Sequence, residues 1–230
     1  MRNKKTLIGI VFIVVVFQFF ILKALLLEEY QYPFCNGITF KEKFQMLEFS
    51  YLFFPLIFYS FFFSQDINDL TVGYGKLYVI RKYSKKKLIL IKMLKQSVFI
   101  LFFIAMQFSV FTIWYKDYKT TPTDSIIRSF IIYFLVLYVL VLITDFLELF
   151  IQPQVAVFIN IIGTYLTMVI GYSSKNQLVK NICFPSLLFG VNNGSFGNGG
   201  VYIASLIEIT VICVSLLTIN MVVYNKKDVF

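Results

Sequence analysis

Six apolar runs, each about long enough to cross a lipid bilayer as a helix, constrain this chain more than any other feature of its sequence. A helix needs roughly 20 apolar residues to span the hydrocarbon core. The runs cover approximately residues 6–27, 45–63, 88–115, 126–144, 154–172 and 201–224. Because lipid offers the backbone no hydrogen-bond partners, each run is expected to be helical. The sequence therefore predicts an all-α integral membrane protein that forms one domain over residues 1–230.

The composition supports the same class. The chain is 59% hydrophobic and only 14% charged, whereas soluble domains are about half apolar and a quarter charged. The net charge of +9 does not indicate nucleic acid, since the cations flank apolar runs instead of forming a solvated face. The lipid bilayer is the expected partner. The bias toward Phe, Ile, Lys, Tyr and Asn is typical of AT-rich coding, so a bacterial cell membrane is the expected location.

Several kinds of chemistry are excluded by what the chain lacks. It contains no histidine, which rules out His-ligated zinc, haem held by a proximal His and a histidine general base. The GYGK sequence at residues 73–76 lacks the spacing of a phosphate-binding loop. We therefore expect no catalytic, metal-binding or cofactor-binding residue, and an intramembrane enzyme is the weakest of the candidate classes.

The three cysteines show no metal-ligand spacing. Cys35 and Cys183 both fall in predicted outer segments, so the sequence allows a disulfide between them and equally allows two free thiols. Cys213 lies inside the last run, where a thiol behaves as a small apolar group.

Lys and Arg residues are concentrated where they would orient the chain. Three of the 21 precede the first run, eight lie in residues 66–95 and two lie in the carboxyl-terminal tail. Cations near span ends mark the cytoplasmic side, so we predict that both termini are cytoplasmic (N-in/C-in). Lys92 and Lys95, in the first turns of the third run, are expected to stand in water or to snorkel toward it.

The segment before the last run contains an apolar piece of its own. Residues 182–191 are too few to cross a bilayer and are interrupted by Pro185. A stretch of this length is typical of a re-entrant or interfacial segment, and a plain apolar outer loop is the alternative.

Polar residues in the fifth run are candidates for a translocation path. Gly163, Thr167 and Gly171 are four residues apart and share one helix face, which lets a neighbouring helix approach closely. Asn160 and Thr164 add polar groups nearby. This face either packs another helix or lines a substrate route.

The last run carries Glu208, with Ser205 close to it on a helical projection. A carboxylate at the bilayer centre costs about 2.5–3.5 kcal/mol on insertion scales, so it should face protein or water. Glu208 is therefore a candidate functional residue, and the alternative is neutralisation by protonation or by an outer cation such as Lys23 or Arg128.

Residues 66–87 follow an ordered pattern that exceeds what orientation requires: an acid, Gly-x-Leu, apolar residues, Arg, Ser-Lys, and then the start of a long helix. This pattern resembles the ABC-2-type transporter permeases, the transmembrane subunits of ATP-binding-cassette exporters. The positions that carry the resemblance are Asp69, Gly75, Leu77, Ile80, Arg81, Ser84, Lys85 and Lys92.

The resemblance implies that residues 66–87 form a cytoplasmic coupling helix between the second and third spans. This helix would dock on an ATPase subunit through Asp69, Gly75, Leu77, Arg81, Ser84 and Lys85. ATP and Mg²⁺ would bind to that partner and not to this chain, which would pair with a second copy or a homologous permease. The resemblance also implies that residues 178–200 are a re-entrant piece before the sixth span.

The small size further resembles permeases of Gram-positive bacteria that export, or confer immunity to, bacteriocins, peptides or cell-envelope antibiotics. The expected function is thus export of, or immunity to, an amphipathic peptide, an antibiotic or a lipid-like substrate. The alternative is a membrane immunity protein that sequesters a toxin without an ATPase.

Overall fold

The computed structural model is helical in all of its described secondary structure. It describes residues 4–24, 46–64, 67, 70, 84–114, 123–174, 176–188 and 199–226. The long helices are α1 (Lys4–Ala24), α2 (Met46–Phe63), α5 (Lys85–Trp114), α6 (Thr123–Glu148), α7 (Pro153–Ser173) and α10 (Gly199–Lys226). Two short elements precede α10, namely α8 (Gln177–Ile182) and the 3₁₀ helix η2 (Phe184–Leu188). Each long helix falls on one of the six apolar runs.

Four of the described helices are long and apolar enough to cross a membrane. They contain the stretches Lys85–Val110, Ile126–Glu148, Pro153–Gly171 and Gly199–Lys226. The apolar parts described in α1 and α2 are shorter, Gly9–Phe20 and Phe53–Phe63. The predicted helical class is confirmed, together with four candidate spans. The six-span arrangement and its orientation stay predictions.

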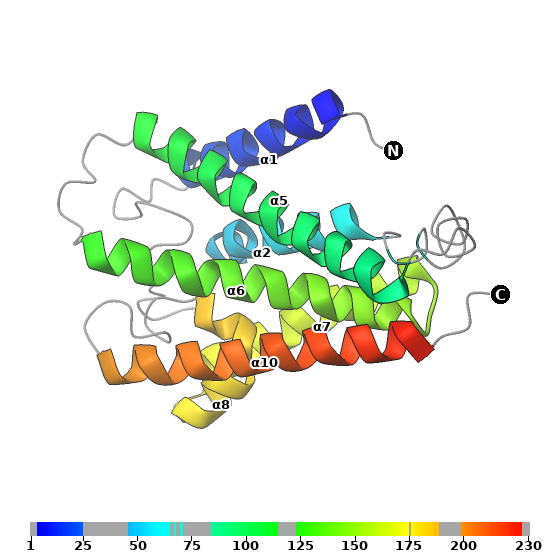
Figure 1. Cartoon of the computed structure of the whole chain (residues 1–230). Coiled ribbons are helices and arrows are strands. Elements are labelled where there is room, and N and C mark those ends of the chain that lie inside the picture. Colours follow the sequence, from blue (N-terminus) through cyan, green and yellow to red (C-terminus); the bar gives the residue numbers. More distant parts are fainter. Residues whose placement is uncertain are drawn as a thin grey trace.

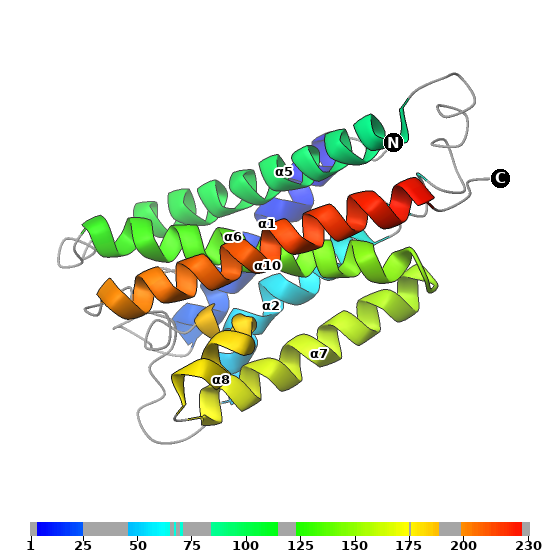
Figure 2. The same ribbon diagram turned by 60° about the horizontal axis from the view of Figure 1, so that its bottom comes forward.

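Helix α6 lies at the centre of the bundle (Figure 1 and Figure 2). It packs against α2, α5, α7, α10 and η2. Residues on successive turns and on different faces of α6 are fully buried, among them Ile132, Val136, Leu137 and Val139. A helix that is apolar on all sides is stable only when other elements surround it, and this explains why the other helices are arranged around α6.

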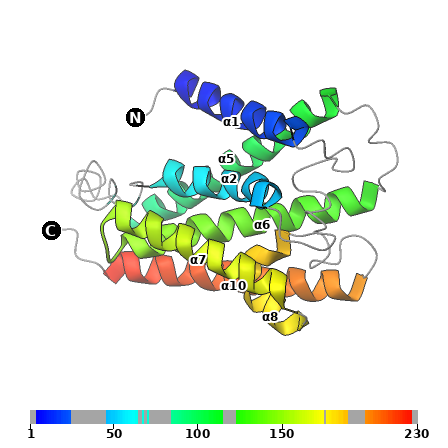
Figure 3. The same ribbon diagram turned by 180° about the vertical axis from the view of Figure 1, so that it is seen from behind.

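The long helices alternate in direction. Figure 1 and Figure 3 show that α1, α5 and α7 begin, and α2, α6 and α10 end, at the same end of the bundle. Short connections favour such antiparallel neighbours. One consequence is that the first turns of α5 lie beside the last turns of α6.

Helix α6 extends beyond its predicted end, which corrects the sequence analysis. The sequence predicts that the fourth run ends at residue 144 and that the fifth begins at residue 154. Instead α6 continues to Glu148, and α7 begins directly at Pro153, where the missing N–H of proline costs no helical hydrogen bond. The helix continues past Asp145 because this charge finds a partner inside the bundle.

The apolar piece before α10 folds back onto the bundle. Pro185, Leu187 and Leu188 of η2 are buried, and η2 packs against α7 and α6. Gly171 of α7 makes this possible, since a Cβ atom at that position would overlap the side chain of Ser186. Residues 185–188 thus complete the core beside α7.

The small-residue face predicted for α7 is correct only at Gly171. A Cβ atom at Gly163 would meet nothing within 4 Å, and Thr167 is partly exposed. The close approach is made by η2 and not by a neighbouring long helix.

We expect Gly171→Ala to lower the free energy of unfolding by about 1–3 kcal/mol, because the added methyl group overpacks the contact with η2. Gly163→Ala is the matched control, and it should leave stability unchanged or raise it, since alanine favours helix and the site is open. Unfolding in mixed detergent micelles measures both values. Equal effects of the two substitutions would contradict the packing of η2 on α7.

Candidate functional site

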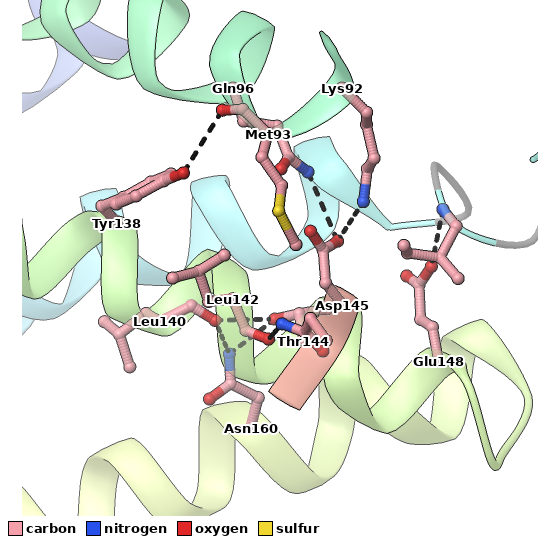
Figure 4. Close-up of polar contacts among 12 residues, drawn as sticks. Lys92, Met93, Gln96, Tyr138, Leu140, Leu142, Thr144, Asp145, Glu148 and Asn160 are labelled. Atoms are coloured by element: carbon pink, nitrogen blue, oxygen red, sulfur yellow. Dashed lines mark hydrogen bonds and ion pairs between the residues drawn. The ribbon is translucent and has the colours of Figure 1, made fainter. Parts of the chain in front are cut away.

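A buried ion pair joins α5 to α6 near the end of the bundle where α5 begins. Lys92 Nζ lies 2.5 Å from Asp145 Oδ1, and Gln96 Nε2 donates a hydrogen bond of 3.3 Å to the same oxygen (Figure 4). Lys92 and Gln96 are four residues apart and therefore share one face of α5. The Asp145 side chain is fully buried. This group of three residues is called the charged junction below.

The charged junction corrects the expectation for Lys92. Its side chain is only 9% exposed, whereas Lys95 is exposed as expected. Burying one charge alone costs several kcal/mol, and a close partner of opposite charge with added hydrogen bonds offsets most of that cost. Lys92 lies inside the protein because Asp145, 53 positions further along the chain, faces it.

A second acidic residue of α6 attaches the segment that follows α2. Glu148 Oε2 accepts a hydrogen bond of 3.3 Å from the backbone N–H of Ile67. Three residues further on, the backbone oxygen of Leu70 accepts a hydrogen bond of 3.5 Å from the Tyr224 hydroxyl of α10. Both residues belong to the predicted coupling segment, which is therefore bonded to α6 and α10 near its amino-terminal end.

Two asparagines bond α6 to its other neighbours. Asn160 Nδ2 of α7 donates to Thr144 Oγ1 at 2.7 Å and to the Leu140 oxygen at 3.1 Å, and it lies 3.3 Å from Ser60 Oγ of α2. Asn220 Nδ2 of α10 donates at 3.0 Å to a main-chain oxygen of α6. Amide side chains in an apolar interior add directional contacts between helices. The last third of α6 is thus bonded to α7 and α10, and Asn160 continues the contact to α2. Figure 4 shows the bonds of Asn160 with Thr144 and Leu140.

Another polar contact lies further toward the opposite end of α5. Gln107 Nε2 donates to Gln18 Oε1 of α1 at 2.6 Å and lies 3.3 Å from the Tyr133 hydroxyl of α6. All three side chains are buried. The sequence analysis overlooked these residues, although glutamines within apolar runs are a signal of buried polar contact.

The residues predicted for a translocation path do not form one cluster. Asn160 and Thr164 are buried on α7, and Ser205 is buried on α10. Thr167 is partly exposed, and its hydroxyl and that of Thr164 donate to main-chain oxygens of α7 itself. Since α7 and α10 each pack on α6, the predicted path residues lie on separate helix contacts. Their role in transport stays a prediction.

Glu208 is partly exposed on α10. Within the described ranges, no hydrogen bond or ion pair joins it to another residue. Arg128, one of the two cations considered for its neutralisation, lies over the ring of Tyr202 at 5.4 Å from the centroid. The side chain of Lys23 lies outside the described part of the structure.

Most of the predicted ATPase-coupling residues lie outside the described ranges, namely Asp69, Gly75, Leu77 and Arg81. Ser84 is exposed, and its backbone oxygen accepts a hydrogen bond of 3.1 Å from the N–H of Leu88 at the start of α5. Lys85, the first residue of α5, is partly exposed. The two described members of this set thus lie at the beginning of α5.

Cys183 lies between α8 and η2 and is buried. Burial raises the pKa of its thiol above the ordinary value, which disfavours the reactive thiolate. Cys35 lies outside the described residues, so the disulfide stays a prediction. In the same described ranges, no group of three or more Cys, Asp or Glu residues could hold a metal ion.

The fold defines the class of this protein: a bundle of apolar helices, four of them able to cross a membrane, held together at one end by buried polar contacts. The chain belongs to DUF2705, a family described as a protein of unknown function, whose model matches residues 11–230. The match includes about two thirds of α1 and all of every other long helix. Comparisons with curated proteins and with solved structures find no match.

We expect removal of either partner of the ion pair to be strongly destabilising. Asp145→Leu and Lys92→Met should each lower the free energy of unfolding by about 3–5 kcal/mol, because the remaining charge stays buried without its partner. The double variant Lys92→Met/Asp145→Leu should recover most of that loss. Unfolding in mixed detergent micelles completes the double-mutant cycle.

The control for this cycle is Lys95→Met, one turn further along α5. Lys95 is exposed, so this substitution should change stability by no more than about 1 kcal/mol. Losses that simply add in the double variant would contradict a direct interaction between Lys92 and Asp145.

Proposed function

We propose that this chain is the membrane-spanning permease subunit of an ATP-binding-cassette transporter of the ABC-2 type. In this proposal all six long helices cross a bacterial cell membrane, with both termini and residues 66–87 in the cytoplasm. The alternating directions of the helices support it, because α1 begins and α10 ends at the same end of the bundle. The cations of residues 84–87 and Lys226 lie at that end, as the positive-inside rule requires.

The length of α5 indicates where the membrane lies along the bundle. Its 30 residues extend about 45 Å at 1.5 Å per residue, which exceeds the hydrocarbon core by about 15 Å. With Trp114 at the outer interface, that excess corresponds to about the first ten residues of α5. Lys95 then lies at the inner interface, where its exposed side chain can snorkel. The ion pair of Lys92 with Asp145 lies just on the cytoplasmic side of it.

The strongest support for this function is that residues 66–87 are bonded to the bundle on both sides. Before the basic stretch, Ile67 is bonded to Glu148 of α6, and Leu70 is bonded to Tyr224 of α10. After it, Lys92 is paired with Asp145 of α6. Both sides of the segment are thus attached to the same end of the same central helix. A segment that only oriented the chain would require its cations and no such attachments.

These attachments suggest a mechanical role for α6. When an ATPase subunit moves the docked segment, α6 receives the displacement through Glu148 and Asp145. Asn160 and Thr144 then connect α6 to α7. Tilting of α6 against α7 would alternate the access of a substrate route in a pair of permeases. ATP and Mg²⁺ bind to the ATPase, and this chain performs no chemistry.

The proposed substrate is an amphipathic peptide, an antibiotic or a lipid-like molecule that is exported, or against which the chain confers immunity. This part rests on the resemblance to small permeases of Gram-positive bacteria.

Charge reversal tests the docking. We expect Arg81→Glu/Lys85→Glu to abolish co-purification of the ATPase subunit from mild detergent, since both cations belong to the proposed docking segment. Membrane insertion should be unaffected, because the six apolar runs are unchanged. Immunoblotting of the membrane fraction and mass spectrometry of the purified complex measure the two results.

The matched control is Lys226→Glu, an exposed cation at the same end of the bundle but on α10, which should retain the ATPase. Retention of the ATPase by the double charge reversal would refute docking at residues 66–87. Purification of the unaltered chain without any ATPase, but with a bound toxin, would favour a sequestering immunity protein.

A further inference from the structure

Polar side chains from four helices meet within the apolar bundle. They are Gln18 of α1, Tyr59 of α2, Gln107 of α5, and Ser129 and Tyr133 of α6, and each is at most 2% exposed. We call these five residues the four-helix polar cluster. None of them was assigned a role by the sequence analysis, and none takes part in the proposed attachment of residues 66–87.

Hydrogen bonds join three members of the cluster, and helix spacing and ring packing place the other two near them. Gln107 contacts both Gln18 and Tyr133. Ser129 precedes Tyr133 by four residues and therefore lies on the same face of α6. The ring of Tyr59 packs edge-on against Phe103 at 4.9 Å between centroids, and Phe103 in turn precedes Gln107 by four residues on α5.

Three atoms of the cluster have unused hydrogen-bonding capacity. Among the described residues, the Tyr59 hydroxyl, Gln107 Oε1 and Ser129 Oγ are buried and have no hydrogen-bond partner. Native interiors leave few such atoms unpaired, and the cost is greatest where the surroundings are apolar. Three of them belong to one cluster, away from the ends of α5 and α6, and a bound ligand with polar groups would satisfy them.

The chemistry of the cluster defines that ligand. Gln107 Oε1 requires a donor, whereas the two hydroxyl groups can donate or accept. No member of the cluster is charged, so an ion would find no compensating charge among these five residues. Water donates and accepts at once, and buried water typically makes about three hydrogen bonds to otherwise unpaired groups. We propose that the four-helix polar cluster binds ordered water inside the bundle.

The bound water would hold the outermost helix in place. Helix α1 packs mainly against α5 and α2, and its opposite face exposes Phe12, Ile13 and Phe17. Gln18 is the buried polar side chain described on α1. Water beside its partner Gln107 adds bonds that join α1 to the other three helices. This site does not depend on the proposed transport function.

Removal of single oxygen atoms tests the proposal. Tyr59→Phe and Ser129→Ala delete an oxygen that has no protein partner in the described structure. If water is bound, each substitution loses hydrogen bonds, and we expect the melting temperature in detergent to fall by about 2–4 °C. Tyr165→Phe and Ser109→Ala, at exposed positions, should leave it unchanged. An unchanged or higher melting temperature in both cluster variants would overturn the proposal, because deleting an orphaned polar atom is neutral or stabilising.

Radical labelling gives a second readout that does not depend on stability. X-ray radiolysis generates hydroxyl radicals from bound water in place, whereas photolysis of peroxide generates them only in bulk solvent. We expect Tyr59 of the unaltered chain to be modified by the X-ray method and not by peroxide photolysis. Absence of modification by either method, or equal modification by both, would overturn the assignment of ordered internal water.

Discussion

The ion pair between Lys92 and Asp145 is the interaction on which the arrangement of this bundle depends. Apolar contacts hold the helices together without strongly preferring one register over another, since lipid tails and leucine side chains are equally apolar. A buried charge prefers one register strongly, because any displacement that separates it from its partner costs several kcal/mol. The pair therefore fixes the position of α5 along α6. The hydrogen bond from Gln96 to Asp145 adds a directional constraint to the same contact.

Helix α6 combines two properties that are usually separate. It is the most enclosed of the long helices, with buried residues on several faces, and its last third carries polar groups that contact α5, α7 and α10. The apolar part provides a rigid core, and the polar part sets the positions of the neighbours. A displacement applied at Glu148 or Asp145 would therefore affect the whole bundle and not a single helix.

Much of the fold could be predicted because membrane helices are recognisable from length and hydropathy alone. The positions of all six long helices and the apolar piece before α10 were anticipated in this way. The end of α6, the burial of Lys92 and the contact of Gly171 with η2 were not. Each of these depends on a residue distant in the chain, and local pattern carries no information on such partners. Four of the six predicted coupling residues lie outside the described ranges.

The sequence by itself determined the class of this protein, since apolar runs of this length must be helical wherever they lie in lipid, and the distribution of cations indicates an orientation. Only the tertiary structure decided which polar residues meet. Asp145 lies just past the predicted end of the fourth run, and Gln18 and Gln107 lie within apolar runs. Hydropathy is a property of single segments, whereas pairing depends on the rotation and height of two helices against each other. For that reason the charged junction and the four-helix polar cluster emerged only from the packed bundle.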